Sequence, residues 1–144
     1  DHYCKYSAEE QVFLVLQRMN ISWYLGMERA LIENKITWQA LNVVTIINSY
    51  FSGIKAAGNS RFKFIKTKKE RFNFGIIERQ TNNDVKYFYS DLERTYMDFL
   101  YFGSYEGKDI KTLIKSLDFK IQRKNAGQYA KYYSKKIGML YGNR

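Results

Sequence analysis

The apolar positions near the start of the chain recur at helical spacing. Residues 8–19 contain no helix breaker, and Phe13, Leu16 and Met19 fall on one face of a helix. Ser7 followed by Glu10 has the spacing of a capping box, in which each residue satisfies a backbone N–H of the other. The pattern therefore predicts a helix that begins after Ser7 and is well buried.

A second helical pattern runs from Ser22 to about Glu33. Tyr24, Met27 and Leu31 lie along one stripe at spacings of three and four, as in a helix with one apolar face. We therefore predict a second helix over this range.

The middle of the chain changes to a period of two. Residues 41–47 contain the β-branched cluster 43–47, which predicts a strand buried on both faces near the centre of a sheet. Polar and apolar residues alternate in 61–66, and strand-like segments follow at 71–78 and 85–89, separated by turn residues. These segments predict an antiparallel meander.

The rest of the chain is predicted to be helical. Ser90 and Glu93 form a second capping-box pattern before an apolar-periodic segment that reaches Leu100, and further helical patterns cover 108–117 and 126–140. The fold class is thus α+β, with two N-terminal helices, a mixed or antiparallel sheet of about four strands and a helical C-terminal part. A length of 144 residues fits a single domain, 1–144.

Composition excludes several classes of protein. Apolar residues make up 45% of the chain and aromatic residues 17%, enough to form a core, so disorder is not expected. No apolar run approaches the roughly 20 residues needed to span a bilayer. The sequence shows no secretory leader and has Cys4 as its only cysteine, so we expect a cytoplasmic protein without disulfides or membrane contact.

The sequence lacks the side chains that most catalytic mechanisms require. The only imidazole and thiol are those of His2 and Cys4, which excludes a zinc site and a Ser-His or Cys-His nucleophile. Gly53 and Gly58 have the spacing of a phosphate loop, but the Lys that must follow is missing. We expect no catalytic residues, no metal and no cofactor.

One enzymatic alternative stays open, a metal-dependent nuclease or another enzyme of nucleic-acid metabolism. Its metal would need converging carboxylates at the sheet, for which the candidates are Glu70, Glu78, Asp84 and Asp91. None of them forms an Asp, then Glu-x-Lys pattern, so the interpretation as solvated strand ends and turns is favoured.

The charge of the chain is concentrated in its second part. The formal net charge is +10; residues 1–60 hold five basic and five acidic side chains, whereas the rest hold 19 and nine. Such a one-sided field attracts polyanions, which makes DNA or RNA a candidate partner, with a merely solvated basic face as the alternative. The candidate nucleic-acid-binding residues form two clusters: Arg61, Lys63, Lys66, Lys68, Lys69 and Arg71, and then Lys120, Arg123, Lys124, Lys131, Lys135 and Lys136.

Aromatic residues lie among these cations. Four phenylalanines are interleaved with the first cluster and could stack on bases: Phe62, Phe64, Phe72 and Phe74. A period of two instead favours aromatic side chains facing the core and lysines facing water. Tyr129, Tyr132 and Tyr133 are likewise interpreted as packing residues.

The segment Phe88 to Leu100, FYSDLERTYMDFL, resembles the strand, Glu-Arg-Thr, helix, Asp signature in the C-terminal domain of AbiEi-type antitoxins of type IV toxin–antitoxin systems. Residues 24–31, 43–45 and 135–140 are similar to further segments of that family in the same order. The matching signature positions are Ser90, Glu93, Arg94, Thr95, Asp98 and, in the closing segment, Gly138.

The resemblance implies a non-catalytic antitoxin and transcriptional-regulator domain. In that family it acts beside an N-terminal winged-helix domain, which this chain does not include, to repress an operon and to oppose a nucleotidyltransferase toxin, directly or indirectly. The signature residues also have a structural interpretation, which we favour: Glu93 as the capping partner of Ser90, and Arg94 with Asp98 as an ion pair within a helix. The sequence leaves the oligomeric state unknown.

Overall fold

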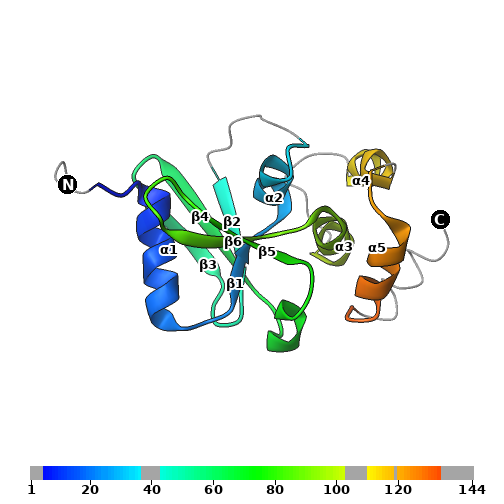
Figure 1. Cartoon of the computed structure of the whole chain (residues 1–144), viewed down its shortest axis with the longest axis horizontal. Coiled ribbons are helices and arrows are strands. Elements are labelled where there is room, and N and C mark those ends of the chain that lie inside the picture. The colour runs from blue at the N-terminus through cyan, green and yellow to red at the C-terminus, as the bar shows by residue number, and fades with distance from the viewer. Residues whose placement is uncertain (1–4, 37–42, 103–109, 119, 134–144) are drawn as a thin grey trace.

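The computed structural model describes residues 5–36, 43–102, 110–118 and 120–133, and Figure 1 shows their arrangement. One mixed sheet contains six strands in the order β3-β4-β2-β1-β6-β5. The α+β class predicted from the sequence is confirmed, but the sheet has six strands rather than about four. The strands are β1 (Trp23–Leu25), β2 (Val43–Asn48), β3 (Gly53–Ala57), β4 (Ser60–Lys66), β5 (Ile76–Gln80) and β6 (Lys86–Ser90).

Helices cover both faces of the sheet. They are α1 (Ala8–Met19), α2 (Met27–Glu33), α3 (Leu92–Phe102), α4 (Ile110–Asp118) and α5 (Arg123–Ala130), with a single 3₁₀ turn η1 (Lys69–Phe72) between β4 and β5. Helix α1 lies on one face, α2 and α3 lie on the other, and α4 and α5 pack outside α3 (Figure 1). Within the described ranges, every helix is too short or too polar to cross a bilayer.

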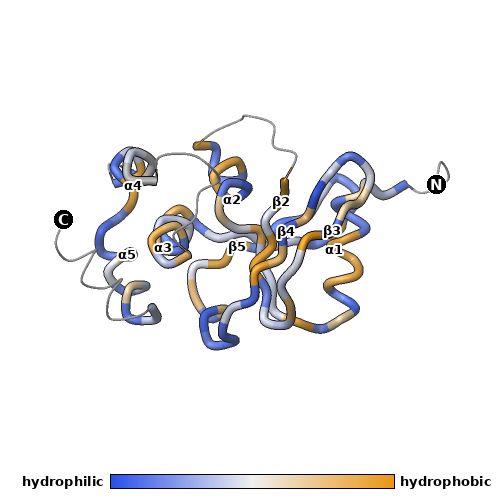
Figure 2. The backbone as a smooth tube through the Cα atoms, turned by 180° about the vertical axis from the view of Figure 1, so that it is seen from behind, coloured by the Kyte–Doolittle hydropathy of each residue, from blue (hydrophilic) through white to orange (hydrophobic). Residues whose placement is uncertain are grey.

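The two faces of the sheet belong to two apolar clusters. Along β1, Trp23 and Leu25 face the α1 side, and Tyr24 faces the α3 side. Phe62 and Phe64 of β4 also join the α1 side, which confirms that these aromatic rings face the core. Figure 2 shows the apolar colour in the central strands and on the helices that cover the two faces.

The predicted second helix is wrong in its first part. Residues 23–25 form strand β1, which pairs antiparallel with β2, and α2 begins only at Met27. All three β1 side chains are buried, because the strand lies between β2 and β6 and has apolar neighbours on both faces. Burial on two faces is a tertiary effect that a one-faced helical stripe does not reveal.

The predicted meander is confirmed for its last two strands and is wrong for its first. Strand β4 pairs in parallel with β2 and antiparallel with β3, a strand that the sequence pattern did not predict. Strands β5 and β6 form a separate hairpin at the opposite edge. The predicted central strand is confirmed, because β2 lies between β4 and β1 and is buried from Val44 to Asn48.

The capping box of α1 is confirmed, and it connects α1 with the β5–β6 turn. Glu10 accepts a hydrogen bond from the Ser7 backbone N–H, and its carboxylate also accepts from the Thr81 hydroxyl and the Asn83 amide. The Thr81 hydroxyl, the Ser7 backbone and the Asn83 amide stabilise the charged form, which lowers the pKa of Glu10 from 4.5 to about 2.

We expect Glu10→Gln to make the free energy of unfolding less dependent on pH in the acid range. Because the pKa is lowered in the folded state, Glu10 contributes stability that is complete above its unfolded pKa and is lost as the pH falls from about 5 to about 2. Urea midpoints measured across this interval should decline less for Glu10→Gln than for the wild type. Glu70→Gln, at an exposed position on η1, is the matched control. Parallel declines for all three proteins would contradict this role of Glu10.

Gly75 precedes β5 at a position where no side chain fits. Its φ is +65°, and a β-carbon there would lie 2.7 Å from Cβ of Arg94 and 3.1 Å from a ring carbon of Tyr129. We expect Gly75→Ala to lower the free energy of unfolding by about 1–3 kcal/mol. Gly127 in α5 has open space around it, so Gly127→Ala should instead raise stability by about 0.5–1 kcal/mol. Thermal unfolding of both variants tests the opposite signs; a similar melting temperature for the two would contradict the steric argument.

Candidate nucleic-acid interface

The first basic cluster separates into exposed and buried members. Strand β4 places Phe62 and Phe64 in the core, so the residues between them face the other side of the sheet. Arg61, Lys66, Lys68 and Lys69 are exposed, Lys63 is half-buried and Arg71 is buried.

Arg71 is buried and bonds to neighbouring elements, which distinguishes it from the exposed members of the cluster. Its Nε donates to the carbonyl of Tyr132 at 3.3 Å, and one terminal nitrogen donates to the Thr67 hydroxyl at 3.2 Å. Its guanidinium also lies 4.0 Å from the ring centroid of Tyr101. Arg71 therefore connects η1 with the end of α5 and with α3.

A cationic hollow lies beside Arg71. It has a volume of about 280 Å³ and is lined by Lys66, Thr67, Lys68, Arg71 and Tyr101. Ammonium and guanidinium groups with a hydroxyl are the donors that bind phosphate oxygens, and an aromatic ring can stack on a base. Of the hollows found among the described residues, this is the one that is lined by several cations and by no carboxylate.

The second basic cluster lies on and around α5. Lys120, Arg123, Lys124 and Lys131 are exposed, whereas Lys135 and Lys136 lie outside the described residues. The hydrogen bond from Arg71 to Tyr132 places Lys131 on a segment next to η1. The structure thus brings the end of α5 to the cationic hollow, although more than 60 residues separate Lys68 from Lys131 in the sequence.

The family-signature residues form a buried arginine network at the start of α3. Arg94 is 1% exposed, and its Nε lies 3.2 Å from Oδ1 of Asp98. Its terminal nitrogens donate to the carbonyls of Arg71 and Phe74 and to the hydroxyl of Tyr24. The predicted ion pair is confirmed, but it is buried rather than exposed on a helix surface.

Asp98 completes this network from the other side. Tyr24 donates to Oδ2 of Asp98 at 2.7 Å, and Tyr133 donates to Oδ1 at 2.6 Å. Burial and then the charge of Asp98 raise the pKa of both tyrosines well above 10. Burial lowers the pKa of Arg94, but Asp98, Tyr24 and Tyr133 together outweigh this effect and the net shift is upward. Arg94 therefore keeps its charge, and Tyr24 and Tyr133 keep their hydroxyl protons, throughout the neutral pH range.

The predicted capping box at the start of α3 is wrong by one residue. Oδ1 of Asp91 accepts from the backbone N–H of Arg94 at 2.8 Å, so Asp91 caps the helix. The hydroxyl of Ser90 is instead 2.6 Å from that of Thr95. Glu93 accepts from the backbone N–H of Gln122, at the start of α5. Gly138 lies outside the described residues.

Asp91 also holds α5, since its Oδ2 accepts from the Tyr129 hydroxyl at 2.7 Å. Burial raises the pKa of Asp91 and of Glu93. The signature residues thus connect the sheet, η1, α3 and α5 by hydrogen bonds.

The candidate nuclease carboxylates occupy different parts of the fold. Glu70 is exposed on η1, and Glu78 on β5 lies 3.9 Å from the Lys86 ammonium. Asp84 is in the β5–β6 turn, and Asp91 is the cap of α3. In the part of the chain that the structure describes, no three His, Cys, Asp or Glu side chains are grouped to hold a metal ion.

Sequence reasoning missed residues that contribute to both sites. Thr67 and Tyr101 line the hollow, and Tyr24 and Tyr133 bind the Asp98 carboxylate. Thr67 lies between the candidate residues Lys66 and Lys68, and this position in the sequence could have indicated it. The tyrosines carry no such signal, because their partners are distant in the sequence.

Comparison with known proteins adds no family assignment to this geometry. No protein-family model matches the chain, and no curated protein shows a significant match to it.

Proposed function

We propose that this chain is a non-catalytic, cytoplasmic regulator domain that contacts the phosphate backbone of DNA or RNA. The observation that carries the proposal is the cationic hollow, where Lys66, Lys68 and Arg71 surround a space large enough for a phosphate group. Lys131 extends the positive surface from the end of α5.

The charge distribution supports this contact. The whole net charge of +10 arises after residue 60, and the exposed cations of β4, η1 and α5 come from that part of the chain. Contacts of this kind fix the position of a protein on a nucleic acid but do not read its bases. The proposed domain therefore adds affinity and leaves sequence recognition to a separate DNA-binding domain.

The resemblance to AbiEi-type antitoxins supports the regulatory part of the proposal. Under this hypothesis the domain acts with a DNA-binding domain to repress its operon and counteracts a nucleotidyltransferase toxin, directly or indirectly. The contacts of Ser90, Glu93, Arg94, Thr95 and Asp98 are consistent with a non-catalytic role, because their side chains bond to one another or to neighbouring elements.

The test is binding of the chain to a fluorescent DNA duplex and to tRNA across a salt series, with Mg²⁺ added at the end. We expect affinity to fall linearly on a double-logarithmic salt plot, without cleavage of either nucleic acid. Absence of binding at low salt would contradict the nucleic-acid contact and leave the action on the toxin as the surviving part. Cleavage after addition of Mg²⁺ would overturn the proposal in favour of a nuclease.

A further inference from the structure

Helix α1 carries more apolar surface than the sheet covers. Phe13 and Leu16 are buried against the sheet, as the sequence predicts. Val15 and Met19, on the flank of the helix, are 56% and 39% exposed, so α1 is less buried than its sequence predicts. This exposed flank extends along the helix from Ala8 to Met19.

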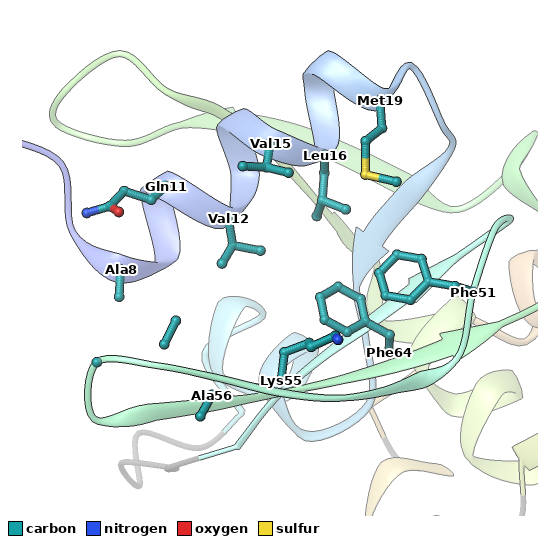
Figure 3. Close-up of a pocket in the computed structure, with 12 residues that line it drawn as sticks. Ala8, Gln11, Val12, Val15, Leu16, Met19, Phe51, Lys55, Ala56 and Phe64 are labelled. Atoms are coloured by element: carbon teal, nitrogen blue, oxygen red, sulfur yellow. The ribbon is translucent and has the colours of Figure 1, made fainter.

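The exposed flank forms one wall of a groove, which we call the α1 groove. Strands β3 and β4 and the loop before them form the opposite wall, with Phe51, Ala57 and Phe64 among its side chains (Figure 3). Near the start of α1, a β-carbon added to Gly58 would lie 3.5 Å from the Ala8 methyl group, so the two walls meet there. The volume is about 590 Å³, within the range of about 300–1,000 Å³ typical of small-molecule sites.

A single charged side chain lines this groove. Lys55 lies opposite Phe62 in the β3–β4 register, which places it on the α1 side of the sheet. Figure 3 shows Lys55 among the side chains that line the groove, and Gln11 is the other polar side chain among them. Among the residues that the structure describes, none forms an ion pair or hydrogen bond with the ammonium group of Lys55.

An apolar site with one cation selects for a particular ligand chemistry. The walls favour removal of an apolar body from water, and Lys55 favours one negative charge at a fixed place beside that body. A protein partner would typically cover about 800 Å² of this chain and would therefore also contact surface outside the groove.

We propose that the α1 groove binds a small amphipathic acid, a free molecule with one carboxylate and an apolar chain or ring system. The carboxylate pairs with Lys55, and the apolar body lies between α1 and the wall formed by Phe51 and Phe64. The groove is on the opposite face of the sheet from the cationic hollow, so this site goes beyond the proposed function and is tested separately from it.

The probe is dansyl-undecanoate, a fluorescent acid whose emission rises in apolar surroundings. We expect saturable binding to the full chain at concentrations below micelle formation. Dodecanoate should displace the probe, whereas dodecyltrimethylammonium, with the same chain and the opposite charge, should not. Absence of saturable binding, or equal displacement by the two competitors, would overturn the proposal.

Variants at exposed positions assign the binding to the groove. Lys55→Glu should weaken binding of the probe about tenfold, because attraction becomes repulsion, and Lys55→Arg should preserve it. Val15→Glu should weaken binding by placing a charge on the apolar wall. The matched control is Lys68→Glu, which changes the net charge equally at the cationic hollow and should leave probe binding unchanged. If Lys55→Glu and Lys68→Glu weaken binding equally, the acid does not bind in this groove.

Discussion

Replacing Arg94 with methionine should lower the free energy of unfolding by about 3–5 kcal/mol, the cost of removing one partner from a buried ion pair. The change leaves the Asp98 carboxylate without its cation in a site that is almost inaccessible to water. It also removes the donors to the carbonyls of Arg71 and Phe74, which hold η1 and the loop before β5 against α3. A loss of this size is unusual for a single substitution. Most substitutions at the surface change the free energy of unfolding by no more than about 0.5 kcal/mol.

Urea unfolding measures the loss, and Arg61→Met is the matched control, since Arg61 is exposed on β4. The double variant Arg94→Met/Asp98→Asn separates the ion pair from the rest of the network. Because the asparagine amide carries no charge to leave unpaired, the double variant should lose less stability than the two single losses added together. A loss below about 1 kcal/mol for Arg94→Met would contradict the structural role that we assign to the buried arginine network.

The double variant Lys66→Gln/Lys68→Gln should weaken binding to duplex DNA by about one to two orders of magnitude at low salt. Both lysines line the cationic hollow, and each phosphate contact contributes about 0.9 to the slope of log affinity against log salt. The slope should therefore fall by about two, whereas the preference among DNA sequences should not change. Fluorescence anisotropy across a salt series measures affinity and slope in one experiment.

Lys35→Gln/Lys86→Gln is the matched control, because it removes the same charge at exposed positions on α2's C-terminal side and on β6. The control should lower affinity only slightly, through the weaker overall field. If both double variants reduce the slope equally, the net charge rather than the hollow governs binding, and the proposed interface is wrong. Since the substituted lysines are exposed, loss of folding is not expected for either variant, and far-UV circular dichroism verifies this.

Features that depend on neighbours in the chain could be predicted from the sequence. Short local patterns predicted three features correctly: the Ser7–Glu10 capping box, the buried strand β2, and the alternation that turns Phe62 and Phe64 toward the core. The one-sided positive charge is also a property of the sequence, and it indicated the candidate cations of the hollow, Lys66 and Lys68. The Arg94–Asp98 pair was predicted because residues four apart meet on one helix face.

Features that depend on distant partners required the tertiary structure. Residues 23–25 are a strand because β2 and β6 lie on either side of them, which overrides their helical spacing. Arg71 is a buried connector rather than a surface cation because the end of α5, about 60 residues later, packs on it. The α1 groove exists because β3 and β4 face the flank of α1 without covering it. Local patterns fix which residues can form an element or carry a charge, whereas burial and pairing are set by the segments that the chain brings together only when it folds.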